Sequence, residues 1–342
     1  MLHFNPREID WCFVLNLKEF NSYLSLTDAI EISQLNNLCR QKQKPKLFSI
    51  LKYGLKNEDL TIFNRELVKG KLNFENIVKD FINEAPKTIS QYFVELAIHN
   101  YFNIYKLVPI VDIFNNLNSI SIFNIFIPLK VIVASCERLR FLKALKLEKV
   151  TLVQFQTDLN TGPLLKLPSE FSCLVLSDCY LIKSELTEDP LKLAYNYDNE
   201  AISKNQLYML DQNFSNLESY TVIGSKSTVT PALIDFLDRH PLITNLTLSS
   251  NLLTQNALNF ISELPSIKNL NIEDRGIDPS LIIPIFPHIR NFKLYFHSSQ
   301  FNSIGHEFYT KLTNLNSLSM NYFRNFAETL TEILQNSPNL KN

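Results

Sequence analysis

The sequence contains little glycine, only 6 residues in 342, which argues against a fold built on several Gly-rich phosphate-binding loops. It also lacks an apolar run of the roughly 18 residues that a membrane-spanning helix requires. The longest apolar stretch, 120–134, is interrupted by Asn124, Pro128 and Lys130. With a formal net charge of -1, the chain has no basic excess to attract nucleic acid or an anionic membrane. We therefore expect neither nucleic acid nor a membrane among its partners.

Features of secreted proteins are also scarce. The five cysteines are an odd number, whereas a disulfide framework needs dense, even spacing in a small chain. They are scattered at Cys12, Cys39, Cys136, Cys173 and Cys179. The first eight residues are mostly polar, unlike a secretory leader. These observations predict reduced thiols and a cytoplasmic or nuclear location.

What the sequence does have is a recurring phrase, apolar-x-x-apolar-x-apolar, clearest at 142–147. Its middle apolar residues are Leu96, Ile120, Leu145, Leu174, Tyr220, Leu246, Leu270, Phe292 and Leu318. Successive copies are 22 to 29 residues apart, except for 46 residues between Leu174 and Tyr220. This period and phrase are typical of leucine-rich repeats.

The spacing within the phrase predicts a short strand with one buried face, because every second residue is apolar. Helical patterns lie between the phrases, for example at 233–237, 258–264 and 330–334. A strand and a helix repeated in this way bury their apolar faces only by stacking on neighbours. We therefore predict the α/β class, as a leucine-rich-repeat solenoid over 86–342, a horseshoe with parallel strands on the concave face. An ordinary α/β domain with Leu-rich strands is the alternative.

Residues 1–55 lack the phrase and predict a separate all-helical unit. Ser25-x-x-Asp28 is expected to begin a helix whose apolar face includes Ile32 and Leu35, and Pro45 to end the helical region. Residues 56–85 also show helical spacing and are expected to form a connector.

The order Tyr23-Leu24-Ser25-x-x-Asp28, Ile32, Leu35, Arg40 and Pro45-x-Leu47-Phe48 resembles the F-box. Cys39 and Phe48 stand where that family has tryptophan. With the repeats behind it, the chain resembles F-box/leucine-rich-repeat substrate receptors, especially divergent fungal ones. The resemblance implies a non-catalytic subunit of a Skp–cullin–F-box ubiquitin ligase that docks a Skp-type adaptor protein. The adaptor contacts would be Tyr23, Leu24, Ile32, Leu35, Leu47 and Phe48. Alternatively, the helices only cap a scaffold or inhibitor-like repeat protein.

Two stretches leave alternatives open. Residues 182–212 carry several acidic and tyrosine residues, and form either a degenerate repeat or an acidic surface insertion. Residues 337–342 read as the lead-in to a further strand, so the sequence is either truncated or poorly capped.

Motifs that would indicate catalysis are absent from the sequence. Six histidines stand at scattered positions, and there is no nucleophile elbow, Walker loop or dinucleotide motif. Cys173 is predicted on the outer side of a strand and Cys179 at a buried position, so the two would not share a metal. We expect neither enzyme activity nor a metal or cofactor.

Strand alternation places a binding face on the residues between and after the buried apolar positions. That face is rich in Ser, Thr and Asn and nearly neutral, which suits a protein target recognised through hydrogen bonds. It would also include Ala97, His99, Ser121 and Ser249. The residues expected to contact the target are Phe123, Lys146, Glu148, Thr221, Thr247, Asn271, Glu273, Lys293, Tyr295 and Asn321.

Overall fold

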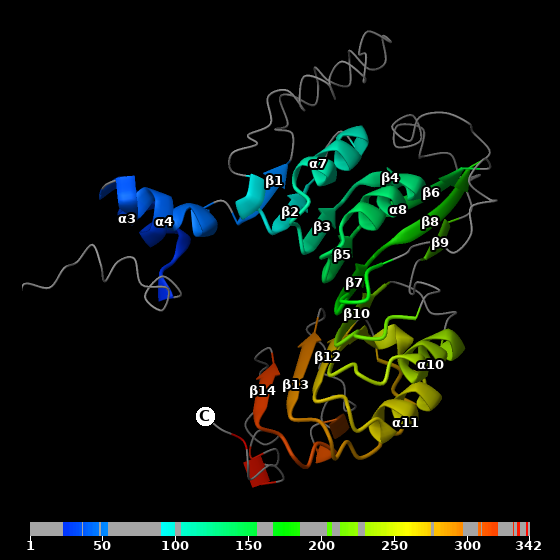
Figure 1. The fold of residues 1–342 in the computed structure, drawn as a ribbon. Coiled ribbons are helices and arrows are strands. Elements are labelled where there is room, and N and C mark those ends of the chain that lie inside the picture. The colour runs from blue at the N-terminus through cyan, green and yellow to red at the C-terminus, as the bar shows by residue number, and fades with distance from the viewer. Residues whose placement is uncertain are drawn as a thin grey trace, which may run out of the picture.

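The fold is a long sheet of parallel strands with helices and a smaller sheet behind it (Figure 1). The computed structural model describes residues 23–53 except 36 and 48, 90–99, 104–155, 167–184, 204–206, 213–224, 230–274, 277–296, 307–320 except 309, and 331, 334, 335 and 340. The predicted connector over 56–85 lies outside these residues.

The main sheet has ten strands, all parallel to their neighbours and arranged in the order of the chain. They are β1 (Ile50–Tyr53), β2 (Glu95–Ile98), β3 (Ser119–Phe123), β5 (Ala144–Glu148), β7 (Cys173–Ser177), β10 (Ser219–Ile223), β11 (Asn245–Ser249), β12 (Asn269–Asp274), β13 (Asn291–Phe296) and β14 (Ser317–Met320). Each of the nine predicted phrases forms one of the strands β2 to β14. The predicted α/β class with a parallel sheet is confirmed.

The same backbone contact recurs at every junction between neighbouring strands of the main sheet. The carbonyl just before one strand accepts hydrogen bonds from two consecutive N–H groups at the start of the next. The series runs from the Ser49 carbonyl, which accepts from Val94 and Glu95, to the Arg290 carbonyl, which accepts from Asn316 and Ser317. This contact fixes the register, so equivalent residues of successive strands lie side by side.

The expectation that residues 1–55 are all helical is wrong for 50–53. This segment is β1, which pairs in parallel with β2 and aligns Leu51 with Leu96. Its short length gives little periodicity, and its strand conformation depends on hydrogen bonds to residues more than forty positions away. The sheet therefore begins before residue 86.

Ahead of β1 lies a helical hairpin of α3 (Leu26–Leu35) and α4 (Asn37–Leu47). The predicted helix start is confirmed as a capping box: the Ser25 N–H donates to Asp28 Oδ2 at 2.7 Å, and the Asp28 N–H donates to Ser25 Oγ at 3.1 Å. These bonds with Ser25 lower the pKa of Asp28. Ala29 and Cys39 are fully buried, and the Lys46 ammonium donates to the Leu24 carbonyl.

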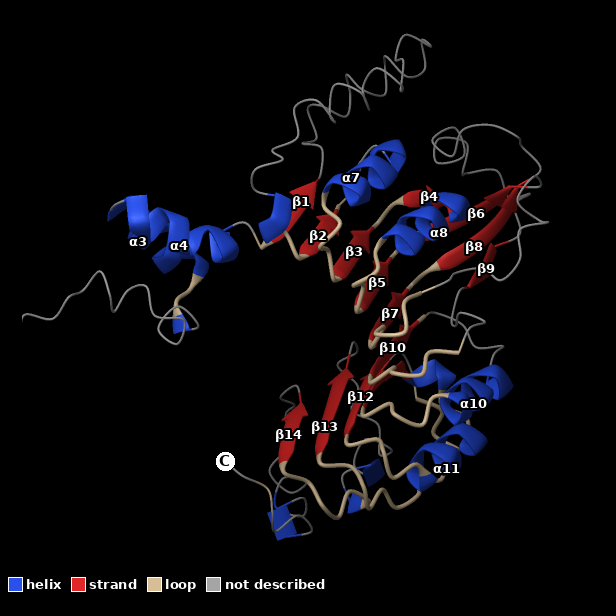
Figure 2. Cartoon of the chain, in the orientation of Figure 1, coloured by secondary structure: helices blue, strands red, loops and turns tan. Residues whose placement is uncertain are grey.

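A second sheet of four strands lies behind the N-terminal part of the main sheet (Figure 2). It contains β4 (Phe126–Pro128), β6 (Thr151–Phe155), β8 (Tyr180–Ser184) and, antiparallel to β8, β9 (Lys204–Gln206). Three left-handed residues turn the chain from the main sheet to this one: Asn124 (φ 48°), Lys149 (φ 55°) and Asp178 (φ 50°). Each donates its N–H to the last carbonyl of the next strand in the main sheet, at 2.7–2.8 Å.

The long step between Leu174 and Tyr220 is now explained. β7 pairs directly with β10, so the intervening residues add no strand to the main sheet. The interpretation as a degenerate repeat is wrong in that respect, because the described part of 182–212 belongs to β8 and β9 of the second sheet. Its described residues, 182–184 and 204–206, therefore agree with an insertion between β7 and β10.

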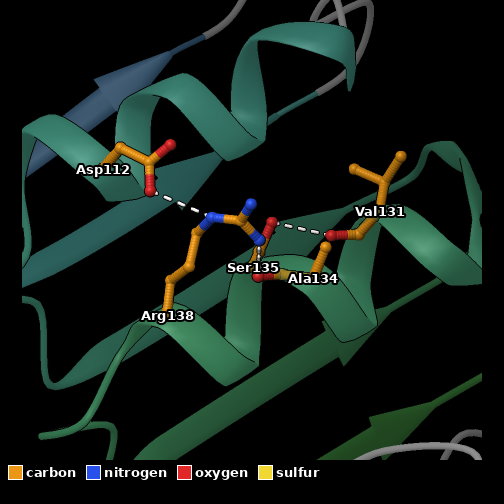
Figure 3. Close-up of polar contacts among 5 residues, drawn as sticks. All are labelled: Asp112, Val131, Ala134, Ser135 and Arg138. Carbon is orange, nitrogen blue, oxygen red and sulfur yellow. Dashed lines mark hydrogen bonds and ion pairs between the residues drawn. The ribbon is translucent and has the colours of Figure 1, made fainter.

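Helices cover the same side as the second sheet. They are α7 (Leu107–Ile113), α8 (Leu129–Arg138), α10 (Thr230–Arg239) and α11 (Gln255–Glu263), with short 3-10 helices at Ser90–Tyr92 (η1), Ile104–Lys106 (η2) and Ser250–Leu252 (η4). The predicted helices at 233–237 and 258–264 are confirmed. Arg138 at the end of α8 pairs with Asp112 of α7 at 3.0 Å, and Ser135 Oγ donates to the Val131 carbonyl at 2.7 Å (Figure 3).

One continuous hydrophobic core joins the buried middle residues of the phrase to these helices. Leu96, Leu145, Leu174 and Leu246 are fully buried, and so are the remaining middle residues of the phrase as far as Phe292. In the described part of the chain, no helix combines the length and apolar character needed to cross a bilayer.

Candidate protein-binding face

The main sheet presents one face away from the core, here called the polar face. In-register pairing places its residues in rows that run across the strands. The middle row reads Ala97, Ser121, Lys146, Val175, Thr221, Thr247, Asn271, Lys293 and Ser319. Three face residues named from the sequence are buried instead: Ala97, Ser121 and Ser249, whose Oγ accepts from the Gly224 N–H at 3.1 Å.

The expected target contacts do lie on this face. Lys293 and Tyr295 are exposed, whereas the others within the described residues are half-buried: Phe123, Lys146, Glu148, Thr221, Thr247, Asn271 and Glu273. Register brings Phe123 beside Glu148 and Glu273 beside Tyr295. Asn321 lies outside the described residues.

In the C-terminal half of the face, polar side chains bond to one another. The Asn291 amide donates to the Asn269 side chain, which donates to Asn245. One row above, Asn271 Nδ2 donates to Thr247 Oγ1 at 2.9 Å. These side chains therefore stabilise the sheet as well as line its surface. The sequence signal was asparagine at equivalent positions of three successive repeats.

The N-terminal half of the face has a different chemistry. The rings of His99 and Phe123 stack 4.7 Å apart and within 5° of parallel. Glu148 lies in the strand next to Phe123, and Lys146 is two residues before Glu148 on the same face. This half offers an aromatic surface flanked by a carboxylate and an ammonium.

The residues expected to contact an adaptor lie on or beside the hairpin. Tyr23 and Leu35 are 88% and 64% exposed, while Leu24 and Ile32 are half-buried. The side chains of Leu47 and Phe48 lie outside the described part of the structure. Two further exposed apolar residues, Ile30 (44%) and Leu38 (53%), were not among the expected adaptor contacts. The hairpin thus exposes an apolar surface, and the neighbouring α4 carries Arg40, Lys42, Lys44 and Lys46.

Two of the thiols, those of Cys136 and Cys179, are held in unreactive surroundings. Burial raises the pKa of Cys136 to about 12 and that of Cys179 to about 11. Cys179 Sγ donates to the Leu147 carbonyl at 3.1 Å, whereas Cys173 is only half-buried and lies on the polar face. Their predicted opposite orientations are confirmed. Within the described residues, no group of three or more His, Cys, Asp and Glu side chains is placed to hold a metal ion.

No protein-family model matches this sequence, and no curated protein matches it significantly.

Proposed function

We propose that this chain is the non-catalytic substrate-recognition subunit of a Skp–cullin–F-box-type ubiquitin ligase. In this proposal the hairpin docks a Skp-type adaptor and the polar face of a leucine-rich-repeat horseshoe holds a target protein. The observation that carries the proposal is the helical hairpin ahead of the sheet with large apolar side chains exposed, in a segment that resembles the F-box. Burying such side chains in a partner would be favourable by roughly 25 cal/mol per Å² of apolar area.

The arrangement of the hairpin also supports docking. Figure 1 shows α3 and α4 projecting beyond β1 instead of lying across the sheet. A projecting hairpin leaves its exposed apolar residues accessible to another protein. Large apolar side chains that are left exposed in this way are available for burial in a partner.

The test is co-purification of the full chain with a Skp-type adaptor protein. Leu35→Glu and Leu38→Glu place a charge on the exposed apolar surface and should each reduce adaptor binding at least tenfold. Ile282→Glu is the matched control, since Ile282 is 74% exposed on another part of the chain. It should bind the adaptor as the unchanged protein does. Failure of the unchanged chain to bind any Skp-type adaptor would reject the proposal.

The second candidate is a scaffold whose N-terminal helices only support the sheet. One observation favours it: α4 runs almost directly into β1, and Ser49 Oγ donates to the Lys46 carbonyl at 3.0 Å. Under this function, adaptor binding is absent with or without Leu35→Glu, and the substitution leaves the free energy of unfolding nearly unchanged because Leu35 is exposed. The adaptor experiment therefore separates the two candidates.

A further inference from the structure

The N-terminal half of the polar face contains two charged side chains that the sheet itself does not neutralise. Lys146 and Glu148 are half-buried on β5. Within the described residues neither forms an ion pair. Partial burial costs a charged group some of its hydration, so a half-buried charge without a partner gains from a ligand of opposite charge.

An aromatic surface adjoins the carboxylate. Phe123 of β3 is the direct register partner of Glu148, and its ring stacks on that of His99, which is exposed. A guanidinium group suits this pair of features, because it stacks on aromatic rings and binds carboxylates with two hydrogen bonds. An ammonium group would meet the carboxylate as a point charge only.

The second charge constrains the ligand further. Lys146 and Glu148 are two residues apart on one strand, about 6.6 Å along it at the usual rise of a β-strand. A ligand that carried only positive charge would be repelled by Lys146. A ligand with an acidic group at the same spacing from its basic group satisfies both side chains.

We propose that this part of the polar face binds a protein segment in which an arginine lies two residues from an aspartate or glutamate. The arginine binds Glu148 and stacks on the Phe123–His99 rings, and the acidic residue binds Lys146. This inference rests on the proposed function, since it specifies the chemistry of the target held by the face. The C-terminal half is less suited to the role, because Asn245, Asn269, Asn271 and Asn291 already bond within the sheet.

The probe is a phage-displayed library of random 12-residue peptides, selected on the immobilised full chain. Selected peptides should be enriched in arginine with an acidic residue two positions away. A selected peptide should bind Glu148→Gln about tenfold or more weakly, as measured by fluorescence anisotropy, because a charge-assisted hydrogen-bond pair is lost. Lys146→Gln should remove the preference for the acidic residue and retain that for arginine, and Phe123→Ala should reduce the preference for arginine over lysine.

Glu137→Gln is the matched control, since Glu137 is exposed on α8, away from the sheet face. It makes the same change in charge and should leave peptide selection unaltered. Three outcomes would each overturn the inference. They are selection without arginine enrichment, no selected peptides at all, and arginine enrichment that survives Glu148→Gln. Adaptor co-purification with the Glu148→Gln protein should be unchanged, so failure on the face is distinguishable from failure of the proposed function.

Discussion

The two halves of the main sheet use the same strand phrase but end their strands differently. After β3, β5 and β7, a left-handed residue turns the chain into the second sheet, and its backbone N–H bonds to the neighbouring repeat. Where β10 ends beside β11, side chains make the equivalent contacts: Ser249 Oγ accepts from the Gly224 N–H, and Asn251 Nδ2 donates to the Gly224 carbonyl at 2.7 Å. The strand is therefore the constant part of each repeat. The hydrogen bonds made where the strand ends, here called its closure, are the variable part.

This difference has an energetic consequence. Closure through backbone groups depends little on which side chain is present, provided that it tolerates the left-handed conformation. Closure through side chains depends on particular hydroxyl and amide groups, and it leaves unpaired partners when they are removed. Substitutions at polar positions should therefore cost more in the C-terminal half than in the N-terminal half.

The largest effects should be those shared by both halves. Leu145 and Leu246 are fully buried middle residues of the phrase, one in each half. Each change to alanine, Leu145→Ala or Leu246→Ala, should lower the free energy of unfolding by about 2–5 kcal/mol through lost burial and the cavity left behind. Chemical denaturation followed by circular dichroism measures it. If one of these substitutions lowered the free energy of unfolding by less than a third as much as the other, the strands would not contribute equally to the two halves.

A buried histidine should have the next largest effect, in the C-terminal half. His240 Nε2 accepts from the Phe214 N–H at 2.9 Å, and Nδ1 lies 2.6 Å from the Phe236 carbonyl, to which it donates. His240→Phe keeps a ring but removes both hydrogen bonds. It should lower the free energy of unfolding by about 1–3 kcal/mol. Exchange of the Phe214 amide hydrogen should also accelerate.

The control for this histidine is His288→Phe. His288 is only half-buried, and the same change there removes no comparable pair of buried bonds. Its effect should stay within about 0.5 kcal/mol. Equal costs at the two histidines would contradict the role given to His240.

Alkaline sensitivity should arise mainly from the thiols of the N-terminal half. The pKa of Cys136 is raised to about 12 and that of Cys179 to about 11, from 9.0, because burial disfavours the thiolate. Above pH 9 the unfolded chain loses these protons while the folded chain keeps them, so the free energy of unfolding falls as pH rises towards 11. Each thiol should contribute about 1.4 kcal/mol per pH unit once titration is complete in the unfolded state.

The measurement is the free energy of unfolding by urea between pH 8 and 11. The slope against pH should be smaller in Cys179→Ala than in the unchanged chain, whatever the variant does to stability at pH 8. Tyr220, whose pKa burial also raises, adds to the slope at the upper end of this range. An unchanged slope in Cys179→Ala would show that this thiol does not contribute.

A smaller effect should separate two threonines in one row of the polar face. Thr247 Oγ1 accepts from the Asn271 amide, so Thr247→Val should cost about 1 kcal/mol. Thr221→Val makes the same change one strand away, where the threonine adjoins Val175, and should be nearly neutral. Thermal denaturation of the two variants side by side measures the difference. Equal costs would mean that the amide–hydroxyl contact adds no stability to the C-terminal half.

The sequence was sufficient to predict the features that depend on local pattern. Period-2 alternation located nine strands, helical spacing located α10 and α11, and Ser25 with Asp28 located the start of α3. The features it did not predict depend on distant partners. β1 is a strand because β2 lies beside it, and His240 was only one of six scattered histidines until folding brought it to the Phe214 N–H.

The features of the candidate site also divide into those that depend on local pattern and those that depend on distant partners. Alternation placed the expected target contacts on one face, since the rule needs only the strand itself. It did not show that the asparagines would bond to each other, because that requires the register between repeats. Nor did it show the stacking of His99 on Phe123, which joins the end of one strand to the next.

The smallest predicted effect is a gain in stability at a corner of the N-terminal half. Asn124 and Asp178 are residue types that adopt left-handed backbone readily, but Lys149, at the equivalent corner, is not. Lys149→Gly should raise the free energy of unfolding by about 0.5–1 kcal/mol, because glycine adopts φ near 55° without a steric cost, although it also makes the unfolded chain more flexible. The control is Lys130→Gly, an exposed position in the first turn of α8 whose ammonium lies 5.7 Å from the centre of the Phe155 ring, where the same change should lower the free energy of unfolding by about 1 kcal/mol. Urea denaturation of both variants measures the contrast. A loss of stability in both would show that the Lys149 side chain, and not the backbone, secures this corner, and the division between the two halves of the sheet would then fail at β5.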